Sequence, residues 1–288
     1  MEILRHAREM RAWSRARRKE GRCIGLVPTM GALHEGHASL MRAAVSGNGV
    51  AVASLFVNPA QFGPSEDFDK YPRSFDADCA MAEGSGIEAI YAPSVRSMYP
   101  DGYATYVNVE RLTSGLCGGS RPTFFRGVAT VVTKLFNAVE PDRAYFGQKD
   151  AQQCAVIRRM ASDLDWGIEI VEMPIVREAD GLAISSRNTY LSPKEREQAL
   201  GMSRGLFAAQ GLFEQGERDV ETIRDVVRRA MKDFRIDYIE AVDVDEMTPV
   251  DPICGRVLLA AAGWVGPTRL IDNVILETGI DKAAGENV

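Results

Sequence analysis

The stretch CIGLVPTMGALHEGH, residues 23–37, passes from a nearly continuous apolar run into a turn that contains glycine and two histidines. An apolar run of this kind is typical of a strand that is covered on both faces, as in parallel sheets. Four later segments have the same character: VAVASLFV (50–57), IEAIYAP (87–93), RAYFG (143–147) and IEIVEMPIV (168–176). Helical patterns lie between them, near residues 37–46, 75–84, 125–138 and 151–163. This alternation predicts an α/β fold, a Rossmann-like doubly wound parallel sheet.

The alternation of strand and helix patterns ends after VREADGLAISSRNTYLSP (176–193). Residues 194–234 contain two helical patterns, and IDYIEAVDVDEM (236–247), RVLLAAAGWVG (256–266) and TRLIDNVIL (268–276) then read as strands. Helices followed by strands indicate a separate α+β unit. We therefore expect a Rossmann-like domain over residues 1–175 and a smaller C-terminal α+β domain over residues 176–288.

Composition excludes several classes of protein. The 288 residues are 45% hydrophobic and 26% charged, as in ordinary globular proteins, and the net charge of −6 argues against nucleic acid as a partner. No run approaches the ~18 apolar residues of a membrane span. The five cysteines are scattered without a C-x-x-C pair, which favours thiols in a reducing compartment. We expect a cytoplasmic protein that binds no membrane.

The first 22 residues run against the acidic trend, with eight Arg or Lys and three Glu. This segment could be a targeting or nucleic-acid arm, or it could be a solvated amphipathic helix. The apolar positions Ile3, Leu4, Ala7 and Met10, continued by Trp13 or Ala16, favour the helix. There is no apolar core of a signal peptide and no small-residue cleavage site.

Four polar clusters follow the predicted strands. They are PTMGALHEGH (28–37), NPAQFG (58–63), GQKDAQQ (147–153) and SSRN (185–188). Ligands of an open parallel sheet bind beyond the carboxyl ends of its strands. Four segments that converge on one such edge predict a binding site more strongly than any single motif does.

The histidines His34 and His37 are two of only three in the chain. Beside a helix N-terminus, which favours anions, their rings can donate hydrogen bonds to phosphate oxygens. A zinc site is the alternative, but zinc proteases space these histidines four apart as H-E-x-x-H, and here the spacing is three. Two structural histidines would be a second alternative.

Lys149 suits phosphate binding if it faces the same edge as the histidines, although such a lysine can also be a plain surface charge. Asp150 can accept hydrogen bonds from ribose hydroxyls, or it can cap the following helix. The SSRN segment has the composition of a mobile phosphate-binding loop. The glycine-rich fingerprints of dinucleotide-binding and P-loop proteins are both absent, so side chains and helix ends must hold the phosphates.

Taken together, these motifs resemble the pantothenate synthetase (pantoate–β-alanine ligase) family. The match rests on VPTMGALHEGH, LFVNPAQFG, DFDKYPR, SRPTFFRGVATVVTKLFN, FGQKDAQQ and VREADGLAISSRNTYLS, from about residue 24 to 192, and continues more weakly to GPTRLIDN. The HEGH element is also similar to the H-x-G-H signature of the wider nucleotidyltransferase superfamily. The resemblance implies an ATP-dependent condensation of pantoate with β-alanine, with Mg²⁺, through an enzyme-bound pantoyl adenylate.

The resemblance also implies residue roles. The catalytic residues would be His34, His37, Lys149 and Arg187, which with Ser185 and Ser186 would bind the ATP phosphates. Gly147 and Asp150 would meet the ribose, and the backbone at Val176 would meet adenine. Pantoate would be held by Gln61, Gln153 and Met30, with Asn58 beside them, and Met30 would also touch ATP. Asp78 would link to magnesium. A homodimer is expected, with the C-terminal domain acting as a lid.

Three positions differ from the residues commonest in the family: Cys117, Phe124 and Gln148. Two other functions are possible. A sister nucleotidyltransferase would act on a phosphorylated acceptor, and such an acceptor would call for more cations than the two glutamines provide. A catalytically silent nucleotide-binding protein would be expected to lose transition-state groups, yet His34, His37, Lys149 and Arg187 are all present.

Overall fold

The computed structural model describes residues 1–64 and 66–278 of the chain. It contains two compact units, Met1–Thr189 and a second that begins at Tyr190. The loop over residues 176–189 thus lies with the first unit. Residues 279–288, which the sequence analysis includes in the C-terminal domain, lie outside the described residues.

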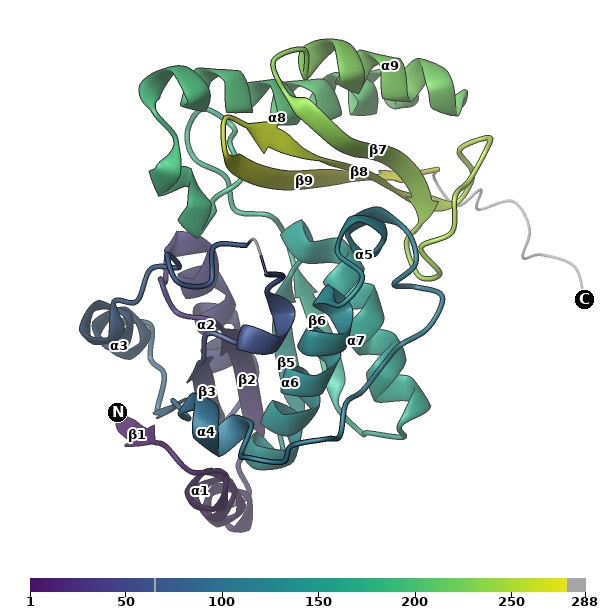
Figure 1. Ribbon diagram of the computed structural model, residues 1–288. Coiled ribbons are helices and arrows are strands. Elements are labelled where there is room, and N and C mark those ends of the chain that lie inside the picture. The colour runs from purple at the N-terminus through teal and green to yellow at the C-terminus, as the bar shows by residue number, and fades with distance from the viewer. Residues whose placement is uncertain (65, 279–288) are drawn as a thin grey trace, which may run out of the picture. The chain divides into compact units, whose positions relative to one another are not determined.

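The first unit is built on a six-stranded sheet in which all pairs are parallel (Figure 1). Its order is β1-β4-β3-β2-β5-β6. The strands are β1 (Glu2–Leu4), β2 (Ile24–Thr29), β3 (Val50–Leu55), β4 (Ala89–Tyr91), β5 (Arg143–Gly147) and β6 (Glu169–Met173). The predicted α/β fold is confirmed. Successive crossovers leave β2 in one direction, toward β3 and β4, and the chain then returns to place β5 on the other side of β2.

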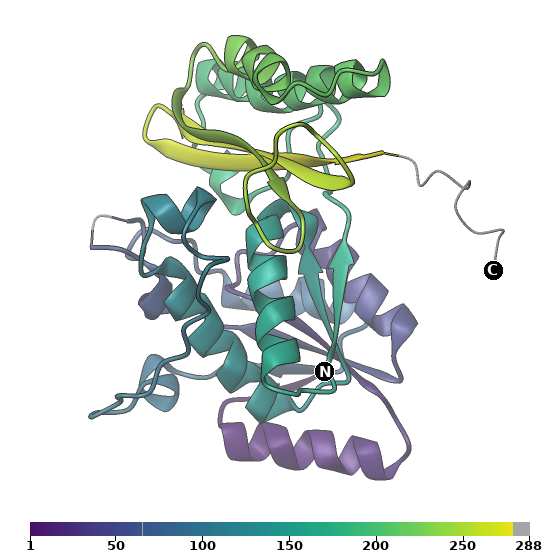
Figure 2. The ribbon, with the colours of Figure 1, turned by 90° about the vertical axis from the view of Figure 1, so that its right-hand side faces the viewer.

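Helices cover both faces of this sheet, as the edge-on view shows (Figure 2). On one face lie α2 (Glu35–Gly47) and α3 (Phe75–Gly84), and on the other lie α1 (Ala7–Lys19), α6 (Phe124–Val139) and α7 (Ala151–Asp163). Shorter helices are α4 (Val95–Met98), α5 (Leu116–Ser120) and the 3₁₀ turns η1 (Pro59–Gln61), η2 (Gln148–Asp150) and η3 (Ser186–Tyr190). Because side chains alternate along a strand, each central strand contributes apolar residues to both layers.

The basic N-terminal segment is a short strand followed by a helix. The expectation that Ile3 and Leu4 belong to the helical stripe is wrong, because both lie in β1 and pair with β4. The helix itself is confirmed as α1, with Met10 and Trp13 buried. Its arginines serve the fold: the guanidinium of Arg11, for example, donates to the carbonyl oxygen of Asn137 at the end of α6.

The second unit contains two helices and three strands, as the sequence predicts, and its strands form an antiparallel sheet. Its elements are α8 (Pro193–Glu214), α9 (Val220–Ala230), β7 (Arg235–Asp243), β8 (Arg256–Val265) and β9 (Thr268–Glu277). The predicted first strand, 236–247, ends earlier than expected, because residues 244–246 form a turn. Within residues 1–64 and 66–278, no helix is both long and apolar enough to cross a membrane.

A glycine sets the distance between α6 and the turn η1. A Cβ at Gly127 would lie 2.2 Å from the carbonyl oxygen of Ala60 and 2.7 Å from the amide nitrogen of Gln61. Real Cβ atoms do not approach backbone this closely, so the NPAQFG segment can rest against α6 only if residue 127 has no side chain. The position of Gln61 therefore depends on Gly127.

We expect Gly127→Ala to lower the free energy of unfolding by about 1–3 kcal/mol, since the helix and the turn must separate. Gly84→Ala is the matched control, because it also lies in a helix of the first unit and its Cβ would meet nothing within 4 Å. Urea denaturation of both variants measures the difference. Equal stabilities for the two variants would contradict the role assigned to Gly127.

Candidate active site

Two of the four polar segments lie at the point where the order of the sheet changes direction. The strand β2 has β3 on one side and β5 on the other, and the two crossovers leave in opposite directions. Such a switch point is where open parallel sheets form a binding crevice, beyond the carboxyl ends of the strands. The loop that carries His34 and His37 follows β2, and the turn that carries Lys149 follows β5. The structure thus brings together two segments that are more than a hundred residues apart.

The two histidine rings stack at the start of α2. Their centroids lie 4.0 Å apart with an interplanar angle of 32°. The backbone N–H of His34, the N-cap residue, donates to Nδ1 of His37 at 3.3 Å. Because Nδ1 of His37 accepts, its ring proton belongs on Nε2, which is then a hydrogen-bond donor.

The glycine between the histidines makes room for the His34 ring. A Cβ at Gly36 would lie 3.0 Å from Cε1 of His34 and 3.1 Å from Nδ1. A side chain at residue 36 would therefore push the ring away from the stacked position. This contact is a physical reason for glycine in the H-x-G-H pattern.

Both imidazoles are neutral at physiological pH. Burial, and then the positive charge of Lys149, lower the pKa of His34 to about 4. Burial, and then the nearby His34 and Lys149, lower the pKa of His37 to about 3. The shared influence of Lys149 shows that β2 and β5 deliver these groups to one place. The positive charge here belongs to the lysine, and the histidines are neutral donors.

Asp78 holds the loop between β2 and α2. Its carboxylate accepts hydrogen bonds from the backbone N–H groups of Ala32 at 3.0 Å and Leu33 at 2.8 Å, and from Oγ of Ser74 at 3.2 Å. The side chain is 4% exposed, and Ala32 has a positive φ of 50°. Donors are directed at both carboxylate oxygens, so Asp78 holds this loop in place. Its link to magnesium, which would run through water, stays a prediction. No three His, Cys, Asp or Glu side chains form a metal-binding group in residues 1–64 and 66–278.

The NPAQFG segment orients an amide toward the first loop. Asn58 is 1% exposed, and its Nδ2 donates to Oε1 of Gln61 at 3.0 Å and to the carbonyl of Gly127 at 3.1 Å. The Gln61 amide therefore directs its Nε2 toward Met30, whose Sδ lies 3.0 Å away. This places Gln61 and Met30, both predicted pantoate residues, in contact, with Asn58 behind them.

Tyr99 completes this network and was missed by sequence reasoning. Its hydroxyl donates to Oδ1 of Asn58 at 2.7 Å, and burial raises its pKa well above the ordinary value, so it remains a donor. Oδ1 of Asn58 also accepts from the N–H of Ala60. No local pattern in the sequence connects residue 99 with residue 58.

The polar residues of the GQKDAQQ segment are of two kinds: one stabilises neighbouring backbone, and others are predicted to contact substrates. Gln152 is buried: its Oε1 accepts from the N–H of Cys117 at 3.0 Å, and its Nε2 donates to the carbonyls of Leu112 and Gly115. Gln153, the predicted pantoate residue, is half-buried in the first turn of α7. Asp150 occupies the N-cap position of α7 but makes no side-chain capping bond, so the capping alternative does not use its carboxylate.

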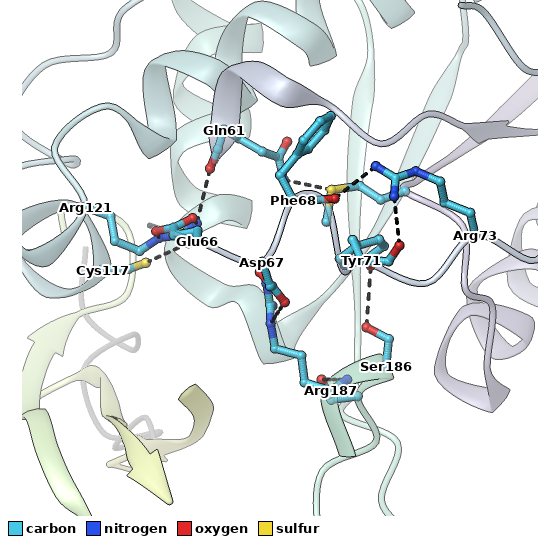
Figure 3. Close-up of polar contacts among 12 residues, drawn as sticks. Gln61, Glu66, Asp67, Phe68, Tyr71, Arg73, Cys117, Arg121, Ser186 and Arg187 are labelled. Carbon is cyan, nitrogen blue, oxygen red and sulfur yellow. Dashed lines mark hydrogen bonds and ion pairs between the residues drawn. The ribbon is translucent and has the colours of Figure 1, made fainter. Parts of the chain in front are cut away.

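The 176–189 loop is folded back on itself. The N–H of Ile184 donates to the carbonyl of Val176 at 3.0 Å, and Ser185 Oγ accepts from the N–H of Arg187 at 3.3 Å. Side chains of this loop reach the segment 66–73, as Figure 3 shows: Arg187 pairs with Asp67, and Ser186 lies 3.5 Å from the hydroxyl of Tyr71. The predicted phosphate-binding residues thus contact a segment to which the sequence assigned no role.

Two of the three residues that differ from the commonest ones in the family, Cys117 and Phe124, contact Arg121. Its guanidinium lies 3.8 Å from the centre of the Phe124 ring, and its Nη1 lies 3.7 Å from Sγ of Cys117. The same guanidinium is paired with Glu66. Phe124 therefore provides an aromatic face for an arginine whose charge is already balanced.

Comparisons with known proteins show which family the chain resembles. The family model described as pantoate-beta-alanine ligase matches residues 2–275. The pantothenate synthetase of Moorella thermoacetica is 56% identical over 280 residues, which cover 96% of this chain and 99% of that protein. The pantothenate synthetase of Acetivibrio thermocellus is 55% identical, with 96% and 100% covered.

Solved structures give the same result. The pantothenate synthetase of Thermus thermophilus superimposes with a TM-score of 0.91 at 42% identity, covering 96% of this chain and 100% of that one. The pantoate-beta-alanine ligase of Francisella tularensis, complexed with beta-gamma ATP and beta-alanine, has a TM-score of 0.79 at 30% identity, with 97% and 99% covered. Matches of this extent in sequence and structure show that the chain belongs to the pantoate–β-alanine ligase family.

Proposed function

We propose that the chain condenses pantoate with β-alanine at the expense of ATP, through an enzyme-bound pantoyl adenylate, with release of AMP and pyrophosphate. The observation that carries this proposal is the pair of neutral histidines beside Lys149 at the switch point between β2 and β5. Membership of the family supplies the substrates, and this arrangement supplies a place where an anionic phosphate can be held. The complex of the Francisella tularensis relative with a nucleotide and β-alanine supports the same assignment.

The geometry supports a division of the site between the two substrates of the first step. Met30, Gln61 and Gln153 would hold pantoate, with Asn58 fixing the Gln61 amide. For ATP, Gly147 and Asp150 would meet the ribose and Met30 would lie at the boundary with pantoate. The carbonyl of Val176 is taken by Ile184, so a contact to adenine would use the N–H of Val176. Ser185, Ser186 and Arg187 would bind phosphate oxygens.

In the first step, the pantoate carboxylate attacks the α-phosphorus and the bond to pyrophosphate breaks. A carboxylate is already ionised at neutral pH, so the step requires no general base. It requires alignment and donors directed at oxygens that gain negative charge. Nε2–H of His37 would be such a donor, and Lys149 would add positive charge. Magnesium would accompany the triphosphate, because protein-bound Mg²⁺ is commonly ligated by substrate phosphates and water.

In the second step, the neutral amine of β-alanine attacks the acyl carbon, and AMP leaves as the amide forms. The mixed anhydride must be kept from water until then. We assign that role to closure of the C-terminal domain, as a lid. We also propose a homodimer in the cytoplasm, in keeping with five free cysteines in the described residues. Sedimentation that shows only a monomer near 31.6 kDa would contradict the dimer.

The central test is exchange of labelled pyrophosphate into ATP, with pantoate and Mg²⁺ present and β-alanine absent. We expect exchange that depends on pantoate, because the first step is reversible while the adenylate stays bound. Absence of exchange in a folded protein that releases AMP once β-alanine is added would exclude a free-standing adenylate step. Absence of both reactions would exclude the activity.

We expect His37→Asn to lower the exchange rate by about 100-fold or more, as loss of a transition-state donor does elsewhere. His6→Asn is the matched control, because His6 is exposed at the start of α1, and this variant should exchange at the wild-type rate. Melting temperatures of the two variants should agree closely. A His37→Asn protein that is unstable but fully active per folded molecule would show that His37 serves folding instead.

The lowered pKa values also predict that the free energy of unfolding decreases as the pH falls below 6.5. Above the ordinary pKa of 6.5 the histidines are neutral in both the folded and the unfolded chain, so they add no pH dependence. As the pH falls from there toward about 3, the unfolded chain binds protons that folded His37 does not, and stability is lost. Urea denaturation at several pH values should therefore show a shallower loss for His37→Asn, by about 1 kcal/mol per pH unit. Parallel curves for the two proteins would contradict a neutral His37.

Tyr99→Phe tests the network behind pantoate. Without the Tyr99 hydroxyl, Oδ1 of Asn58 loses a hydrogen-bond donor, so the Asn58 amide, and with it Gln61, is held less firmly in its orientation. We expect the KM for pantoate to rise about tenfold, with the KM for ATP nearly unchanged. Tyr106→Phe, at an exposed tyrosine, is the control. An equal rise in both KM values would show that Tyr99 acts on the whole site and not on pantoate.

A further inference from the structure

Two adjacent carboxylates hold two arginines from distant parts of the chain (Figure 3). Glu66 accepts from Nε and Nη2 of Arg121 at 2.6 and 2.5 Å. Asp67 accepts from Nε and Nη2 of Arg187 at 3.1 and 2.9 Å. Both pairs are bidentate and use the same edge of the guanidinium, the geometry in which an arginine–carboxylate pair is strongest.

The two arginines differ in the donors that remain. Nη2 of Arg121 also donates to the carbonyl of Gln61 at 3.2 Å, and its Nη1 contacts Cys117. In Arg187, by contrast, Nη1 makes no hydrogen bond to any residue of 1–64 or 66–278. Asp67 therefore occupies one edge of the Arg187 guanidinium and leaves the Nη1–Nη2 edge available for another acceptor.

The segment that carries Asp67 is fixed from both ends. At its start, Glu66 is fastened to Arg121. Further on, the guanidinium of Arg73 donates to the carbonyls of Phe68 at 2.9 Å and Tyr71 at 3.2 Å. The rings of Phe68 and Tyr71 pack edge-on against Phe62. Because the segment is held at both ends, the Asp67 carboxylate can fix the orientation of the Arg187 guanidinium.

The Asp67–Arg187 pair is partly removed from water, with 25% and 31% of the side chains exposed. Burial would raise the pKa of Asp67, but the hydrogen bonds and charge of Arg187 lower it below the ordinary value, so the carboxylate is ionised at neutral pH. The pair is thus charged on both sides and screened less than a surface pair.

We propose that Asp67 is a positioning residue for nucleotide binding: it holds Arg187 by the Nε–Nη2 edge so that the Nη1–Nη2 edge faces a phosphate of ATP. An arginine presents two such edges, and either can meet two oxygens of a phosphate at once. Holding one edge removes the cost of ordering a long side chain when the nucleotide arrives. The inference rests on the proposed function, in which Arg187 binds ATP.

The test is a double-mutant cycle on ATP affinity, measured by calorimetry on the full chain without turnover. Asp67→Asn keeps the size of the side chain and removes its charge. Arg187→Lys keeps the positive charge and removes the guanidinium group that can donate two parallel hydrogen bonds. We expect each change to raise the Kd for ATP about tenfold, and the double variant to be no weaker than either single one. Asp69→Asn, the same change at an exposed position of the same segment, should leave the Kd unchanged.

The other outcomes overturn the proposal in different ways. Tighter ATP binding by Asp67→Asn would mean that Asp67 competes with the phosphates for Arg187. An unchanged Kd for Asp67→Asn beside a raised one for Arg187→Lys would remove the positioning role and leave the proposed function in place. An unchanged Kd in both would remove Arg187 from the ATP site as well. A matching loss of pantoate affinity and melting temperature in Asp67→Asn would assign Asp67 to the fold alone.

Discussion

The position of β2 in the sheet is the constraint on which the site depends. Parallel strands must be joined by crossovers, and these are right-handed, so a chain that leaves β2 toward β3 and later returns to β5 places its helices on opposite faces. The connections at the carboxyl ends of β2 and β5 therefore diverge, and this is the place where open parallel sheets bind their ligands. The histidine loop and the GQKD turn come to one place for this topological reason, before any contact between their side chains is considered.

Electrostatics at this place follow from the same arrangement. Two imidazoles that are stacked, partly buried and close to a lysine cannot be charged together with it at low cost, so protons are displaced from the rings. The positive charge of Lys149 acts on both rings. A phosphate bound here would therefore meet a fixed cation and neutral donors. In the proposed first step, neutral donors would stabilise developing charge without making the site so positive that pyrophosphate could not leave.

Periodicity revealed the elements with strong local signals. Central strands such as β3 are apolar on both faces, and long amphipathic helices such as α7 repeat every three to four residues, so both were predictable. The strand β1 was not, because three residues at a sheet edge beside a basic helix carry no period of their own. The helices α4 and α5 are likewise too short for a pattern. Their form depends on tertiary contacts, such as the buried Gln152 that holds the start of α5.

The residues of the site likewise fall into a group that the sequence reveals and a group that only the structure reveals. The resemblance supplied the residues that are predicted to contact the substrates, and these occur in contiguous motifs. The residues that support them lie far away in the sequence: Tyr99 acts on Asn58 across 41 positions, and Asp67 acts on Arg187 across 120. Pairing between single polar side chains leaves no periodic trace in one sequence, so structure alone reveals it. Asp78 is a further case, because its contacts with the backbone N–H groups of Ala32 and Leu33, 46 and 45 positions away, leave no pattern in the sequence. Each of these supporting groups contacts one predicted binding residue or its immediate neighbour, so a substitution behind the site would alter the binding of one substrate while every recognisable motif stays intact.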